Sequence, residues 1–265
     1  MAKIIPLCSS SKGNSVLVCL GKTNILIDIG CSFRILNTYL KYFNYSILDI
    51  SAVLITHEHT DHVYGLNTLI KNTNIPVFAT EGTTNGIIEK SMIEPELRCY
   101  IHNDIKEIEL DTEIKYFKTS HDTYDSVGYV INSGINGCSF AYCTDLGEVT
   151  REVRTAVLGS DVVFLESNYC RNRLDQNPRY PNFLKKRIKS SSGHLSNRQS
   201  AEFAAELVKN GTKRIILGHL SQENNTPDLA YQCNAETLYN NNIKNGVDYI
   251  LNVAGPVNEG WFAAV

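Results

Sequence analysis

The hydrophobic positions in the first half of the chain fall into short runs that are separated by turn residues. Most of these runs are too short for helices, and residues 52–56 (AVLIT) are almost continuously apolar, as in strands buried on both faces. The predicted strands of this half are residues 3–7, 16–20, 24–29, 52–56, 77–79 and 114–119. Helical spacing of hydrophobic residues predicts helices over residues 33–43, 65–71 and 83–90.

The second half repeats this alternation of strands and helices. Its predicted strands are residues 127–131, 139–143, 162–166, 213–217 and 248–253. Its predicted helices are residues 197–210, with Ser196 or Asn197 as the N-cap, and residues 228–240. No low-complexity linker divides the halves. The pattern therefore predicts an α/β fold in a single domain, residues 1–265, whose two αβ halves pack as a four-layer αββα sandwich.

Composition narrows the class of protein. The 265 residues are 43% hydrophobic and 20% charged, which excludes a collagen, a coiled coil and a largely disordered chain. With a net charge of −3, any nucleic-acid role must rest on a local patch. No apolar run approaches the roughly 18 residues that cross a bilayer, and the first residues lack signal-peptide features. We expect a cytoplasmic protein with no membrane partner and with reduced cysteines.

The segment His57-Glu58-His59-Thr60-Asp61-His62 is the most specific chemical signal in the chain. It holds three of the seven histidines and follows directly on the apolar run at residues 52–56. Imidazole and carboxylate groups bind divalent metals, and the end of a strand holds them rigidly. The segment therefore predicts a metal site.

Further polar residues follow predicted strands elsewhere in the chain. His121, Asp145 and His219 each come shortly after a strand, and His194 precedes a predicted helix. Because sites of α/β proteins gather at one rim of a sheet, we expect these side chains to lie near the histidine segment. His102 has no such setting.

These residues resemble the metallo-β-lactamase fold in their order and spacing over nearly the whole chain, and residues 27–30 (IDIG) match that fold's first motif. The resemblance implies two divalent metal ions between the halves. The implied ligands are His57, His59 and His121 for one ion, Asp61, His62 and His219 for the other, and Asp145 as a bridge. Asp28 would orient a ligand histidine. Ligands of this kind leave Mn²⁺, Zn²⁺ and Fe²⁺ open.

Several segments resemble one branch of this fold, the YycJ/WalJ branch. They are residues 9–15 (SSSKGNS), followed by THEHTDH, and residues 192–197 (SGHLSN). Members of that branch are regarded as 5′→3′ exonucleases on double-stranded DNA, linked to mismatch repair. The resemblance implies a dinuclear metal-dependent phosphodiesterase that acts on double-stranded DNA, and it favours manganese.

The resemblance also implies catalytic residues. In phosphodiesterases of this fold, a carboxylate supports a histidine that protonates the leaving oxygen. Glu166 and His194 match these positions, so His194 is the candidate general acid and Glu166 its partner. An imidazole can donate a proton at neutral pH. Asp61 counts among the catalytic residues through its place in the metal site.

Two segments are candidates for substrate contacts. The small hydroxyl residues, lysine and glycine of residues 9–15 suit an anion. Residues 170–193 form a basic insertion with seven Lys and Arg against one Asp, which suits a phosphate backbone, and Tyr169, Tyr180 and Phe183 could stack on bases. The candidate contacts are Ser11, Lys12, Asn14, Arg171, Arg173, Lys185, Lys186 and Arg187.

Other functions stay open at this point. A ribonuclease or RNA-processing hydrolase, a hydrolase of a small phosphodiester and a thioester hydrolase of the glyoxalase type would share these ligands. A metal-binding module without turnover would not need His194. A β-lactamase is disfavoured because Asp145 stands where those enzymes usually have cysteine. The residues also leave open whether the chain forms a homo-oligomer.

Overall fold

The fold is given by a computed structural model that describes residues 2–108, 110, 112–134, 137–258 and 260–264. Two sheets are present, one in the strand order β13-β1-β2-β3-β4-β5-β6 and one in the order β12-β11-β10-β9-β8-β7. The strands are β1 (Ala2–Ser10), β2 (Gly13–Leu20), β3 (Thr23–Ile27), β4 (Ala52–Leu54), β5 (Val77–Phe78), β6 (Ile101–His102), β7 (Thr112–Lys118), β8 (Val127–Ser133), β9 (Ser139–Cys143), β10 (Val162–Glu166), β11 (Arg214–Gly218), β12 (Ile250–Val253) and β13 (Ala263–Ala264).

Nine α-helices and three short 3₁₀ helices occur in the described ranges. The α-helices are α1 (Phe33–Tyr42), α2 (Thr60–Val63), α3 (Leu66–Asn72), α4 (Glu81–Glu89), α5 (Arg151–Val157), α6 (Arg171–Gln176), α7 (Asn182–Ile188), α8 (Asn197–Lys209) and α9 (Pro227–Asn240). The 3₁₀ helices are η1 (Ile47–Asp49), η2 (Pro95–Tyr100) and η3 (Ile105–Glu107).

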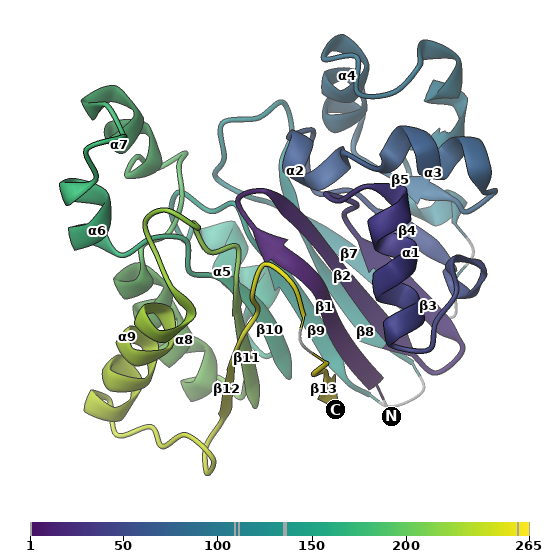
Figure 1. The fold of residues 1–265 in the computed structure, drawn as a ribbon. Helices are drawn as coiled ribbons and strands as arrows, with labels where there is room; N and C mark the ends of the chain where they lie inside the picture. The colour runs from purple at the N-terminus through teal and green to yellow at the C-terminus, as the bar shows by residue number, and fades with distance from the viewer. Residues whose placement is uncertain (1, 109, 111, 135–136, 259, 265) are drawn as a thin grey trace.

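The two sheets are built alike. Each begins with antiparallel neighbours, β1 to β3 in one and β7 to β9 in the other. Each continues with parallel neighbours, β3 to β6 and β9 to β12. Parallel strands end at the same edge of a sheet, so the loops after β3, β4, β9, β10 and β11 gather at one end of the sandwich. This end lies at the top of Figure 1, near α2.

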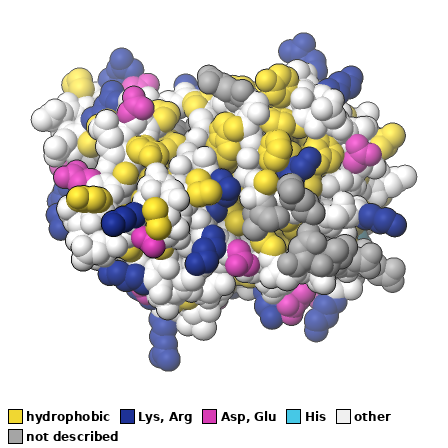
Figure 2. All heavy atoms as spheres, turned by 90° about the horizontal axis from the view of Figure 1, so that it is seen from below, with side chains coloured by type: hydrophobic (Ala, Val, Ile, Leu, Met, Phe, Trp, Pro, Cys, Tyr) yellow, Lys and Arg dark blue, Asp and Glu magenta, His cyan; other side chains and the backbone are white. Residues whose placement is uncertain are grey.

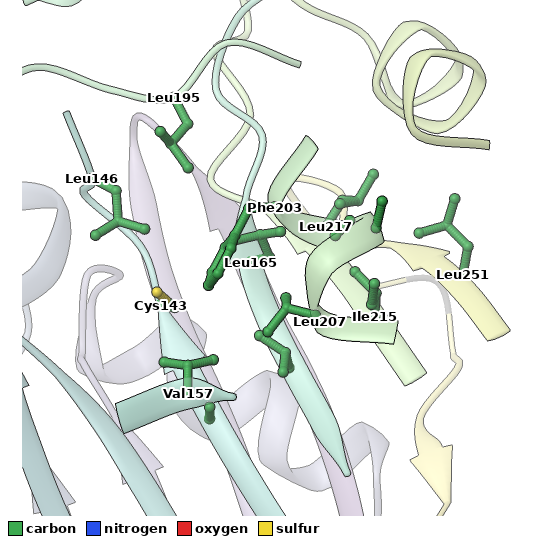
Figure 3. Close-up of a cluster of buried hydrophobic side chains, with 14 of the residues drawn as sticks. Cys143, Leu146, Val157, Leu165, Leu195, Phe203, Leu207, Ile215, Leu217 and Leu251 are labelled. Atoms are coloured by element: carbon green, nitrogen blue, oxygen red, sulfur yellow. The ribbon is translucent and has the colours of Figure 1, made fainter. Parts of the chain in front are cut away.

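Three hydrophobic clusters separate four layers. One lies between the sheets, and a second lies under α1, α3 and α4 on the outer face of the first sheet. The third lies under α5, α8 and α9: in Figure 3, Val157, Phe203 and Leu207 of these helices pack against Leu165 and Ile215 of the second sheet. The four-layer αββα sandwich that the hydrophobic pattern predicted is confirmed.

The differences from the predicted elements have local causes. The helices α2, α5, α6 and α7 were not predicted because each has at most seven residues and buries at most two hydrophobic side chains, whereas α3, which is equally short, buries three. The strand predicted over residues 24–29 ends at Ile27 because Asp28 adopts a left-handed backbone with φ of 59°. At α8 the N-cap is Ser196, in a capping box with Gln199.

The described part of the chain contains no helix long and apolar enough to cross a membrane. Figure 2 shows the end of the molecule that faces down in Figure 1, where hydrophobic side chains gather in one region with Lys and Arg side chains around it. The histidines and aspartates described next lie at the opposite end.

Candidate metal centre

The seven side chains that the resemblance assigned as ligands come together at the top end of the sandwich. His57, His59, Asp61 and His62 follow β4, and the last two lie on α2. The other three follow β7, β9 and β11, the strands whose carboxyl ends meet there. The structure groups these side chains in sets whose ligand atoms are within 4.8 Å of one another. We call them the metal centre.

Three imidazoles form the first group of the metal centre. His59 Nδ1 lies 3.0 Å from His57 Nε2 and 3.3 Å from His121 Nε2. Burial lowers the pKa of all three rings, which keeps them in the neutral form that binds metal. Glu58, although it lies between two of them in the chain, points away and accepts a hydrogen bond of 3.0 Å from Lys90 Nζ.

Asp61, His62 and His219 form the second group. Asp61 Oδ2 lies 3.5 Å from His62 Nε2 and 3.5 Å from His219 Nε2. Asp145 stands between the groups, since its Oδ1 is 3.4 Å from His121 Nε2 and its Oδ2 is 3.4 Å from His62 Nε2. One carboxylate is therefore placed to serve both groups.

Two buried atoms test whether a metal fits this place. Eight buried side-chain polar atoms of the described residues make no hydrogen bond, and two of them, Asp145 Oδ2 and His219 Nε2, lie in the metal centre. An unsatisfied buried polar atom costs about 1–3 kcal/mol, a cost that a bound cation would remove at these two atoms. Both are ligand atoms of a nitrogen and oxygen set that suits borderline divalent cations. The residues present thus fit divalent metal ions.

Asp28 fixes the orientation of the His62 ring. Its Oδ2 lies 2.7 Å from His62 Nδ1, and its Oδ1 accepts a hydrogen bond of 2.8 Å from the backbone N–H of Thr56. This contact directs His62 Nε2 into the metal centre. Burial alone would lower the pKa of His62, but Asp28, Asp145 and Asp61 raise it to about 9, so a bound metal must displace a proton.

Three residues of this site have a left-handed backbone although none is glycine. The φ angles are 59° for Asp28, 57° for Asp145 and 54° for His219. Non-glycine residues in this region are uncommon and occur most often where the backbone must turn sharply. Each of the three follows a strand, so the turn directs its side chain across the end of the sheet.

Asn14, which the sequence suggested as a substrate contact, is fully buried. Its Nδ2 lies 3.1 Å from His62 Nε2 and 3.3 Å from Asp61 Oδ2. The neighbouring backbone is packed so tightly that a Cβ at Gly30 would lie 1.7 Å from the carbonyl oxygen of Asp61. Asn14 is therefore placed to orient the side chains of His62 and Asp61. Ser11 and Lys12, in the turn just before it, stay exposed.

Glu166 joins His194 to the metal centre. Its Oε1 lies 2.8 Å from both His194 Nδ1 and His219 Nδ1. Its Oε2 accepts hydrogen bonds from the backbone N–H groups of Leu146 and Leu195. Burial would raise the pKa of Glu166, but His194 and His219 lower it to about 2, so the carboxylate stays charged.

The contact between Glu166 and His219 was not foreseen from the sequence. A signal for it exists, because β10 and β11 pair in parallel with Glu166 opposite Gly218, directly before His219. Two polar residues that end neighbouring parallel strands are expected to meet. The sequence shows only that both residues end predicted strands, and the register that sets them opposite each other comes from the structure.

The basic insertion, residues 170–193, forms α6 and α7 beside the metal centre. Figure 1 shows these helices on one side of this end of the sandwich and α2 on the other. His121 Nδ1 lies 3.1 Å from the carbonyl oxygen of Gly193, and the N–H of His194 bonds to the carbonyl of Ile188. The insertion thus packs directly against one ligand and against the candidate general acid.

Much of the positive charge of the insertion is paired within the fold. The Asp175 carboxylate pairs with Arg171 and Lys189, and the Asp175 backbone carbonyl accepts a hydrogen bond from Lys185 Nζ. Two acidic residues outside the insertion join it: Asp122 pairs with Arg187, and Glu223 pairs with Arg179. The net positive charge at this surface is therefore smaller than the sequence indicated. Arg173 donates to the carbonyl of Asn225.

The aromatic residues in the insertion and next to it differ in exposure. Tyr169 is 4% exposed and cannot stack on a base, whereas Phe183 is 75% exposed.

Asp122 is a functional candidate that the sequence reasoning missed. It follows His121 and pairs with Arg187, so it holds a cation of α7 next to the metal centre.

Comparison with known proteins supports this architecture. The model of the family described as "Beta-lactamase superfamily domain" matches residues 23–220. Exodeoxyribonuclease YycJ of Bacillus anthracis is 32% identical over 234 residues, which cover 88% of this chain and 87% of that protein. Exodeoxyribonuclease WalJ of Streptococcus pneumoniae is 31% identical over 246 residues, which cover 92% of this chain and 90% of that protein.

Solved structures share the fold at lower identity. The metallo-β-lactamase fold protein YhfI of Bacillus subtilis superposes with a TM-score of 0.69 at 15% identity and covers 99% of both chains. The short form of human tRNase Z superposes with a TM-score of 0.63 at 17% identity and covers 99% of this chain and 98% of that one.

The fold, the metal centre and these similarities define a metal-dependent hydrolase of the metallo-β-lactamase fold. The chain belongs to the β-lactamase superfamily and, within it, is a YycJ/WalJ-like protein. The resemblance that the sequence motifs indicated is confirmed.

Proposed function

We propose that the protein is a dinuclear metal-dependent nuclease, a 5′→3′ exonuclease on double-stranded DNA that is linked to mismatch repair and works in the cytoplasm. Relatives that match about nine-tenths of the chain are named exodeoxyribonucleases, which supports a nucleic-acid substrate. Two ions are proposed because Asp145 reaches both groups of ligands.

The observation that carries the proposal is His194, held by Glu166 at the edge of the metal centre. Its side chain is 21% exposed, so a substrate can reach it, and its Nδ1 is hydrogen-bonded to Glu166. The other ring nitrogen is the one that can donate a proton to the leaving oxygen of a phosphodiester. When bound, divalent ions would polarise the phosphodiester and ease the ionisation of the attacking water.

A paired cleavage assay tests the proposal. Purified protein with Mn²⁺ is given 5′-phosphorylated duplex DNA and, separately, single-stranded RNA of matched sequence. We expect mononucleotides to be released from the 5′ ends of the DNA and the RNA to stay intact. Cleavage of RNA alone would instead favour an RNA-processing hydrolase. Cleavage of neither by metal-loaded protein would leave a hydrolase of a small phosphodiester or a metal-binding module without turnover.

Charge reversal in α7 is expected to lower the rate at which nucleic-acid polymers are cleaved. With Lys185→Glu, Lys186→Glu and Arg187→Glu together, kcat/KM on duplex DNA should fall far more than on a small chromogenic diester, which reaches no flanking contact. Each lost phosphate contact should flatten the slope of log(kcat/KM) against log[salt] by about 0.9, or roughly 2–3 for the triple variant.

The matched control reverses Lys209, Lys213 and Lys244, which lie away from the metal centre and change the net charge by the same amount. It should keep the salt dependence of the unaltered protein. Equal losses on duplex DNA and on the small diester would mean that α7 does not contact nucleic acid.

A further inference from the structure

A cavity of about 650 Å³ lies beside the metal centre and is not used by the chemistry described so far. It is bounded by the turn between β1 and β2, by the residues that lead into α1, and by α2. Asp61 forms part of its wall and also belongs to the second ligand group. The cavity therefore opens next to the place where a bound phosphodiester would be cleaved.

The walls of this cavity differ in chemistry. Tyr64 is 63% exposed and Ile35 is 39% exposed, which gives an apolar side with one flat aromatic ring. Ser11 and Lys12, both exposed at the tip of the β1–β2 turn, give a side with a hydroxyl and a cation. A ligand that fits both sides has a planar apolar part and a negative charge, and a nucleotide has both.

The position of Tyr64 relative to the metal centre is fixed by the backbone. Tyr64 is the C-cap of α2, three residues after Asp61, and residues at this spacing are neighbours on one face of a helix. Its N–H bonds to the carbonyl of Thr60, and the next residue, Gly65, bonds to the carbonyl of Ile29. A Cβ at Gly65 would lie 2.4 Å from the carbonyl oxygen of Cys31, so this turn has no room to shift.

We propose that the cavity binds the nucleoside next to the cleaved phosphodiester, with its base against Tyr64 and Ile35 and a neighbouring phosphate at Lys12. The volume lies within the range of small-molecule sites, about 300–1,000 Å³. A free phosphate would make no favourable contact with the apolar side formed by Tyr64 and Ile35. The inference rests on the proposed nuclease function, and it makes Tyr64 a residue that positions the substrate on the side of the metal centre opposite α7.

The test is a cycle that combines Tyr64→Ala with abasic substrates. Duplex DNA carries an abasic nucleotide at the first or, in a second substrate, at the second position from the 5′ end. Stacking of a base on an aromatic side chain contributes enough for a loss of roughly 5- to 150-fold in kcat/KM when the ring is removed. On intact DNA, we expect kcat/KM of Tyr64→Ala to fall by this factor relative to the unaltered protein. On the abasic substrate that lacks the base stacked on Tyr64, the two proteins should have nearly the same kcat/KM.

Two variants control the cycle. Tyr64→Phe keeps the aromatic face and should cleave intact DNA at close to the original rate. Tyr239→Ala removes a ring of similar exposure, 71%, at the end of α9 and should leave the rate unchanged. Metal content and thermal unfolding of Tyr64→Ala should match those of the unaltered protein, which excludes a folding defect.

The outcomes separate this inference from the proposed function. If intact DNA is cleaved but Tyr64→Ala cleaves it as fast as the unaltered protein, or loses equally on intact and on both abasic substrates, the cavity does not bind a base while the nuclease stands. If the unaltered protein cleaves no nucleic acid, the proposed function and the inference fall together.

Discussion

Asp145→Ala is expected to lower kcat/KM by at least about a thousandfold and to reduce the number of bound metal ions per chain. Its carboxylate is the group that faces both ligand sets, and one of its oxygens is buried without a hydrogen bond. Divalent ions supply several kcal/mol of charge stabilisation in phosphoryl chemistry, and 1.4 kcal/mol corresponds to about tenfold in rate.

The charge of Asp145 is secure in the folded protein. Burial would raise its pKa, but the positive charge of His219 and His62, whose own pKa values are raised, holds it well below the usual range, so the carboxylate is ionised throughout the neutral region. Asp145→Asn keeps the size of the side chain and removes only the charge. It should therefore behave nearly as badly as the alanine variant.

The measurement is metal content by elemental analysis together with the rate on duplex DNA, over a range of added Mn²⁺. Asp248→Ala, which removes an exposed carboxylate far from the metal centre, is the matched control and should keep both. A variant of Asp145 that holds its metal and keeps its rate would refute the two-ion arrangement.

His194→Ala is expected to lower kcat on DNA by about 100- to 10,000-fold while the metal content stays unchanged, because a general acid contributes that much. The loss should depend on the leaving group. A diester that releases p-nitrophenolate needs no proton at the leaving oxygen, so it should lose much less. This dependence distinguishes proton donation from a structural role.

The same variant tests the one rival role that the geometry allows. His194 also falls within a set of possible ligand atoms with Asp145, Glu166 and His219. If His194→Ala loses metal in step with activity, and loses equally on both kinds of leaving group, His194 is a ligand and the general acid must be sought elsewhere. His102→Ala, on the edge strand β6, is the histidine control and should be unaffected.

The gathering of these histidines and aspartates could be predicted from the sequence for a simple reason. They either lie within six residues of one another or directly follow strong apolar runs, so the pattern of strands already placed them at one end of the sheets. The long strands and the helices α1, α8 and α9 were foreseen on the same ground, since their hydrophobic periods are long enough to read.

What could not be predicted depends on contacts between segments far apart in the chain. Asn14 was expected at the surface of a turn, and only the packing of the turn against α2 shows that it lies under the ligands. Tyr169 was expected to face a substrate, but its pairing with Ser196 buries it. The partner of Arg187, Asp122, lies 65 residues away and carries no local pattern.

The left-handed turns at Asp28, Asp145 and His219 make the stability of the fold depend on whether metal ions are bound. Backbone strain of this kind costs roughly 1–3 kcal/mol at each residue, and stability of a domain is only about 5–15 kcal/mol in total. A glycine would relieve the strain but would remove the side chain that the site needs. A ligand that binds only the folded state stabilises it, so the metal ions are expected to offset the free energy that the turns cost. Removal of metal should therefore shorten the lifetime of the folded protein as well as abolish its activity.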